Sequence, residues 1–232
     1  MLSLVRRRLT LGAVSGGGDN PGGDVPEPNE VLYELTEAGS FDVLVPVNGE
    51  YELQACTSGA GAGYIYSFSP YYNGGGGASG CLLTAKLNMN AGTYRVAIPA
   101  GGKQGKENVD SGRGEAGQDL VVFLGDSEYL HMKPHSNGGA STSGSAASGG
   151  SYSNATLSVA PTFIGSSMKG NAGNGRNNNA SNKYDGGASP VGNKANSGAG
   201  GYGDDGNSKV NSRNSRDGMA GYFKLTYLGE NA

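Results

Sequence analysis

Several residue types that functional sites commonly rely on are scarce or missing in this chain of 232 residues. It contains no tryptophan, two histidines and two cysteines, and only 16% of its residues are charged. Cys56 and Cys81 are too few for a disulfide framework and do not match a zinc spacing, so we expect buried thiols, with a bridge between them as the alternative. No window reaches the 18 or so apolar residues of a membrane span, and a net charge of −3 gives no electrostatic footprint for nucleic acid. We expect neither kind of partner.

Apolar residues are also few, at 35%, whereas glycine occurs 44 times. This composition favours one modest core with extended glycine-rich connections. In the most biased stretch, residues 134–217, 17 residues are Gly, 16 are Ser and 13 are Asn. Ordering each residue costs roughly 1–2 kcal/mol of backbone entropy, which so few apolar side chains cannot offset. We therefore expect this stretch to be held by backbone hydrogen bonds in polyproline-II geometry and by neighbouring chains.

The N-terminal residues 1–15 combine apolar and basic side chains. The apolar run after Arg8 is too short for the core of a secretion signal, so we expect an arm that lies on a larger partner. A solvated leader without function is the alternative. The expected anchoring residues are Leu2, Leu4, Val5, Arg6, Arg7, Arg8 and Leu9. The Gly/Pro-rich residues 16–28 are expected to form a linker, so that 1–28 are an arm and linker and 29–232 a single domain.

From Val31 onward the apolar residues alternate with polar ones, as in β-strands. Residues 41–47 and 51–55 flank Asn48-Gly49, and we expect them to form a β-hairpin. Further strands are expected at 81–88, 93–98, 120–124, 128–132 and 221–228. The segment 120–124 is apolar on both faces and should be central. The sequence thus predicts an all-β protein, a jelly-roll-like β-sandwich, with residues 133–218 as a Gly/Asn/Ser-rich insertion and 219–229 as the closing strand.

The layout of these strands and glycine clusters resembles the glycine-rich domains at the ends of tail fibres and other projections of tailed bacteriophages. The resemblance covers roughly residues 41–228. It rests on the strands 41–46 and 49–55 followed by the glycine-rich run 59–63, on Gly74 to Gly77, on 91–102, on 117–121 and on 218–225. Where the family often has longer pure glycine runs in its second half, this chain uses Asn and Ser, so we do not expect a regular polyglycine lattice but short polyglycine-II-like segments at most. The resemblance implies a virion structural protein, often trimeric, that sometimes contacts a host receptor.

Residue patterns for catalysis and metal binding are weak. His131 and His135 have the spacing of a zinc helix, but Pro134 lies between them and the glutamate of such a motif is absent. Residues 100–107 resemble a phosphate-binding loop but lack its first glycine and its Ser/Thr. The acidic turn 204–207 lacks the alternating ligands of a calcium loop. We expect no catalytic residues, no cofactor and no metal.

One loop does suggest recognition, because it concentrates aromatic residues between glycine runs. Aromatic faces at a loop tip suit sugars or protein partners, although packing between subunits is the simpler explanation. These residues are Tyr64, Tyr66, Phe68, Tyr71 and Tyr72.

The sequence therefore predicts a non-enzymatic virion protein of a bacteriophage fibre or surface decoration, attached by its arm and homo-oligomeric, with a trimer favoured. The alternatives are a fibre-tip adhesin for a host glycan or protein and a bacterial surface Gly-rich protein.

Overall fold

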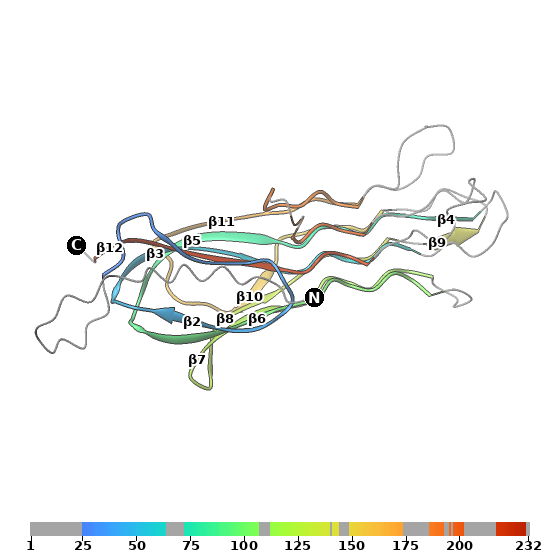
Figure 1. The fold of residues 1–232 in the computed structure, drawn as a ribbon. Helices are drawn as coiled ribbons and strands as arrows, with labels where there is room; N and C mark the ends of the chain where they lie inside the picture. Colours follow the sequence, from blue (N-terminus) through green and yellow to red (C-terminus); the bar gives the residue numbers. More distant parts are fainter. Residues whose placement is uncertain are drawn as a thin grey trace, which may run out of the picture.

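The computed structural model describes residues 25–63, 72–106, 112–139, 141–143, 149–173, 186–192, 195, 197–201 and 217–230. Within these ranges the protein is all-β and contains no helix, so no described helix could cross a membrane. Figure 1 shows a two-layered body of strands at one end and, extending from it, a bundle of long, wavy segments. The two parts are built from the same chain, which passes repeatedly from one to the other.

The first sheet has five antiparallel strands in the order β1-β12-β3-β5-β11. Their bounds are β1 Val31–Leu35, β12 Tyr222–Gly229, β3 Gly49–Cys56, β5 Leu82–Met89 and β11 Gly165–Lys169. From Gly49 to Ala55 of β3 the odd-numbered residues are buried and the even-numbered ones are half-buried, as expected for a sheet with one face on a core, while Cys56 at the end of the strand is also buried. The last described strand, β12, lies between β1 and β3. The sequence predicted that this closing strand joins the sheets but not its place in them.

The second sheet also has five antiparallel strands, in the order β10-β8-β7-β6-β2. Their bounds are β10 Thr156–Val159, β8 Ser127–Lys133, β7 Leu120–Leu124, β6 Gly92–Ile98 and β2 Gly39–Val45. β7 is the middle strand, which confirms the expectation drawn from its apolar faces. A separate two-stranded sheet pairs β4 Tyr72–Gly74 with β9 Ser141–Ser143.

The expected β-sandwich is therefore confirmed, but the expected hairpin is wrong. β2 pairs with β6 and β3 pairs with β5 and β12, so the turn at Asn48-Gly49 crosses from one sheet to the other. Asn48 Oδ1 accepts a 2.7 Å hydrogen bond from the N–H of Ala91, which ties this crossing to the β5–β6 turn. An Asn-Gly pair between two strands typically predicts a hairpin. Each of the flanking strands has one apolar face to bury, however, and the two strands can bury these faces in the common core from opposite sheets.

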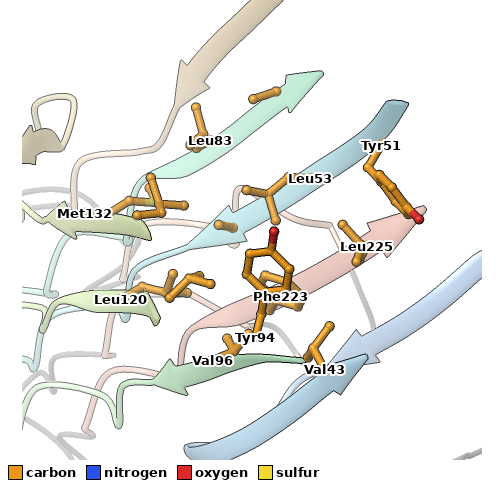
Figure 2. Close-up of a cluster of buried hydrophobic side chains, with 14 of the residues drawn as sticks. Val43, Tyr51, Leu53, Leu83, Tyr94, Val96, Leu120, Met132, Phe223 and Leu225 are labelled. Carbon is orange, nitrogen blue, oxygen red and sulfur yellow. The ribbon is translucent and has the colours of Figure 1, made fainter. Parts of the chain in front are cut away.

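The core lies between the two sheets and consists of large side chains that point inward from both (Figure 2). Tyr51 and Tyr227 lie with ring centroids 5.2 Å apart, and Tyr94 lies 5.1 Å from Tyr129. The hydroxyl of Tyr51 donates to the carbonyl of Val47, so the polar end of this buried ring is satisfied. Burial raises the pKa of Tyr51 and of Tyr94 and, for Tyr129, to about 12.

The Gly/Asn/Ser-rich residues 133–218 also contribute strands to the sandwich. β10 pairs with β8 at the edge of the second sheet, and β11 pairs with β5 at the edge of the first. Leu157, Phe163 and Met168, three of the few apolar residues of this stretch, pack against the core. Residues 133–218 thus contribute two edge strands to the sandwich, while their other described segments lie outside its two sheets.

Candidate functional site

The bundle that extends from the sandwich is the most unusual feature of the molecule. We call it the lattice, and it consists of the described segments 57–63, 75–81, 99–106, 112–119, 134–139, 149–154, 170–173, 186–189, 197–201 and 217–221. Each segment precedes or follows a strand along the chain, except 186–189 and 197–201, which lie between β11 and β12. The chain therefore leaves the sandwich and returns to it repeatedly (Figure 1).

The hydrogen bonds of the first lattice segment follow a period of three. The N–H groups of Thr57, Ala60 and Gly63 donate to carbonyls of the segment 75–81 at 3.1, 2.9 and 2.9 Å. The residues that follow Thr57 and Ala60 donate instead to the segment 112–119. Because a β-strand alternates its hydrogen bonds with a period of two, this pattern indicates the three-residue turn of polyproline II.

A three-fold segment directs its main-chain groups to all sides, and the lattice is accordingly hexagonal. Segment 57–63 exchanges N–H···O bonds with six other segments, which form a closed ring around it. In order around the ring these are 75–81, 197–201, 217–221, 99–106, 112–119 and 134–139. Every residue of 57–63 is buried, although none is larger than threonine.

The segment 75–81 is a second centre. Its hydrogen-bonded neighbours are 57–63, 134–139, 149–154, 170–173, 186–189 and 197–201. The two centres share neighbours, so the ten described segments are two fused hexagons with two segments inside and eight outside. The hydrogen bonds that define both hexagons join segments of the same chain, as the expectation of backbone hydrogen bonding required.

Glycine is required in the lattice because neighbouring main chains touch. A Cβ atom at Gly59 would fall onto the carbonyl oxygen of Ala199, and one at Gly77 would fall onto that of Ala60. Neither glycine has a positive φ, so the requirement is for space and not for a left-handed backbone. Ala60 shows the converse case, since its methyl group is fully buried and accommodated.

Charged side chains occupy only one part of the lattice surface. They lie on 99–106, 112–119 and 217–221, which surround the first centre; the described ones are Lys103, Lys106, Arg113, Glu115, Asp119 and Asp217. Lys103 Nζ and Asp217 Oδ2 form an exposed ion pair of 2.7 Å. The segments on the far side of the second centre, 149–154, 170–173 and 186–189, present only Ser, Asn, Ala, Gly and Tyr.

His131 lies where the lattice joins the sandwich. Its Nδ1 is 3.0 Å from Glu128 Oε2 and its Nε2 is 2.8 Å from Asp119 Oδ2. Burial lowers the pKa of His131, but the hydrogen bonds to Asp119 and Glu128 outweigh this effect and raise it above its ordinary value. Both ring nitrogens face carboxylate oxygens, which accept but do not donate, so the doubly protonated imidazolium fits this site best.

The two cysteines are buried and free, as one of the two sequence alternatives proposed. Burial raises the pKa of Cys56 far above its usual range, so its thiol is held protonated and unreactive. Cys81 contacts the hydroxyl of Tyr152 at 3.3 Å. Both thiols therefore act as small packing groups where strands pass into the lattice.

The remaining predicted site residues are dispersed or undescribed. Among the described residues no group of three or more His, Cys, Asp and Glu could hold a metal ion. His135 lies apart from His131, in contact with Thr156 Oγ1 at 2.5 Å. The loop 100–107 is lattice as far as residue 106.

The anchoring residues Leu2 to Leu9, the acidic turn 204–207 and four of the five aromatic residues lie outside the described residues. The fifth, Tyr72, begins β4 and pairs with Ser143.

Sequence reasoning missed the lattice as a single feature. It treated the glycine clusters at 59–63, 74–77, 101–102 and 112–117 as separate connections between strands. The usable signal was that each cluster directly follows or precedes a strand, so antiparallel strands place all clusters at the same end. A scan of the chain against protein-family models matched no family, and a search of the curated proteins found no relative.

Proposed function

We propose that this protein is a non-enzymatic structural component of a bacteriophage particle, part of a fibre or surface decoration, attached to the particle by its N-terminal arm. The observation that carries the proposal is the lattice itself. Its described residues include no buried acidic or basic side chain, and its segments are joined by main-chain hydrogen bonds, which suits a rigid projection.

The two ends of the molecule support a division between attachment and projection. The described chain begins at Val25, and the N–H of Asn29 donates to the carbonyl of Tyr227, near the end of β12 that is remote from the lattice. The arm therefore enters the domain at the end opposite the lattice. A protein held by this arm would present its lattice away from the surface that carries it.

Removal of Met1 to Gly18 tests the attachment. The shortened chain should keep its fold, because β1 and the residues that pair with it start beyond the deletion, and it should no longer be incorporated into particles. Incorporation would be measured by immunoblotting of purified particles. Undiminished incorporation would show that the arm is not the anchor.

A second candidate function is recognition of a host glycan or protein by the end of the lattice. It is favoured by the position of Gly63 and Gly75, which are bonded at 2.9 Å at the lattice end remote from the sandwich and flank the aromatic run. The residues proposed for contact are Tyr64, Tyr66, Phe68, Tyr71 and Tyr72.

Substitution of the four tyrosines by alanine tests this candidate. Adsorption of particles to host cells should fall by tenfold or more, since aromatic contacts contribute about 1 kcal/mol or more each, while incorporation of the protein stays unchanged. Equal adsorption would leave only the structural function. The matched control is Ser151→Ala with Ser153→Ala, which changes an exposed part of the lattice without removing aromatic rings.

A further inference from the structure

The end of the sandwich remote from the lattice has a surface character of its own. We call it the base, and it comprises residues 25–31, 44–50, 89–93, 124–128 and 227–230, where the strands of both sheets begin or end away from the lattice. Six large apolar side chains are exposed in the described chain, and four of them belong to the base. They are Val25, Val31, Leu44 and Leu124, with exposed fractions of 54, 44, 55 and 39%.

The charge of the base is of one sign. Its carboxylates are Glu27, Glu30, Glu50, Asp126, Glu128 and Glu230, and none of its residues is Lys or Arg. The basic side chain nearest to these carboxylates is His131, whose Nδ1 lies 3.0 Å from Glu128 Oε2, and Lys86, Arg95 and Lys224 lie at mid-strand. The base thus combines exposed apolar groups with carboxylates, a combination that a basic apolar segment would complement.

Such a segment belongs to the same chain and leaves from the same place. Residues 2–11 contain five leucines or valines, at positions 2, 4, 5, 9 and 11, and three consecutive arginines. The connection from Leu11 to Val25 spans 14 residues and is rich in glycine. Its root-mean-square reach is about 20 Å, since Gly-rich chains extend by about 5–6 Å times the square root of their length.

The length of this connection matches the width of the base, which the docked segment would have to cross. Five strands spaced about 4.8 Å apart span roughly 19 Å. A tether of this length gives the segment an effective concentration in the millimolar range at the base of its own copy. We propose that residues 2–11 dock on the base of the same chain, with the leucines against the exposed apolar side chains and Arg6 to Arg8 against its carboxylates.

This inference goes beyond the proposed function, because it concerns the chain before it meets a particle. A docked arm covers its own apolar residues and becomes available only when an acceptor binds it more tightly than the base does. The apparent affinity for the acceptor is then reduced by the fraction of arms that are free. Premature association between free copies would be suppressed in the same way.

The absence of tryptophan from the chain provides the test. In the full-length Leu4→Trp variant, the single tryptophan should be blue-shifted, and acrylamide should quench it several-fold less than in a peptide of residues 1–14 with the same substitution. Neutralising the base with Glu27→Gln, Asp126→Asn and Glu230→Gln should raise quenching towards that of the peptide. Raising the salt concentration should act in the same direction.

A control variant carries the same charge change away from the base. Ala100→Lys, Ala116→Lys and Ala172→Lys add three positive charges at exposed lattice positions and should leave quenching unchanged. Equal quenching of the full chain and the peptide would overturn the proposal, as would equal effects of the two triple variants. Protection that rises with protein concentration, together with association in sedimentation, would overturn docking within one copy. Unchanged circular dichroism confirms that each variant folds, and none of these outcomes depends on attachment to a particle.

Discussion

The sandwich and the lattice use opposite means to order the same chain. In the sandwich, large side chains from two sheets fill a common core, and Leu225, Tyr94 and Met132 are almost fully buried there. In the lattice the largest residue of either central segment is a threonine or a cysteine, and neighbouring main chains bond directly. A segment poor in apolar residues can therefore be ordered when enough main chains surround it, because its N–H and C=O groups form hydrogen bonds within the bundle.

The sandwich and the lattice should also differ in the kind of substitution that destabilises them. A deleted side chain leaves a cavity in the sandwich, whereas an added one finds no space in the lattice. Three substitutions would separate these mechanisms.

Leu225→Ala should have the largest effect. Leu225 is fully buried between the sheets, and removal of its side chain should lower the free energy of unfolding by about 2–5 kcal/mol. Urea unfolding followed by circular dichroism measures the change. A decrease in the free energy of unfolding of less than about 1 kcal/mol would mean that the side-chain core does not stabilise the sandwich.

Gly59→Ala should cost about 1–3 kcal/mol or more, because its methyl group would overlap the Ala199 carbonyl oxygen. Hydrogen exchange should locate the loss in the lattice amides, while amides of the sandwich stay protected.

The matched control for Gly59→Ala is Gly165→Ala, since a Cβ there meets nothing within 4 Å and its φ is not left-handed. Equal stability of these two variants would show that the main chains of the lattice are too loosely packed to exclude a methyl group.

His131→Gln should have the smallest effect and should depend on pH. The pKa of His131 is raised in the folded protein, so the stabilisation is fully present below the ordinary value of about 6.5 and is lost as the pH rises through the folded pKa. Both carboxylates are more than a third exposed, so solvent screening limits the difference to about 1 kcal/mol.

Melting temperatures of the wild type and His131→Gln should therefore differ at pH 5.5 and converge at alkaline pH. A difference in melting temperature that is the same at pH 5.5 and pH 9 would show that the charge of His131 does not stabilise the contact between the sandwich and the lattice.

Much of the sandwich could be predicted because its strands carry a local pattern. The alternation Tyr94, Val96, Ile98 specifies an exposed and a buried face, and the structure has β6 there. Pairing could not be predicted in the same way, because the Asn48-Gly49 turn is compatible with a hairpin and with a crossing between sheets. The strands β10 and β11 were missed because Thr156–Val159 and Gly165–Lys169 are short edge strands with little apolar character.

The lattice was harder to predict, because it has no local pattern of side chains. Gly59 is required by Ala199, which lies 140 residues further along the chain, and Gly77 contacts Gly201 through a 2.9 Å hydrogen bond. A single sequence contains no local trace of such distant contacts. The free, buried state of Cys56 and Cys81 could be anticipated from their count, but the two carboxylates around His131 could not, since Asp119 precedes a different strand.

The position of β12 has a consequence for synthesis. This strand fills the place between β1 and β3, and the lattice segment 217–221 that precedes it completes the ring around 57–63. Until residues 217–229 leave the ribosome, the first sheet lacks the strand between β1 and β3, and the ring around 57–63 lacks one of its six segments. Chains that stop early would keep two bare strand edges, which are substrates for aggregation and proteolysis. The fold is therefore complete only after the chain has been synthesised through β12.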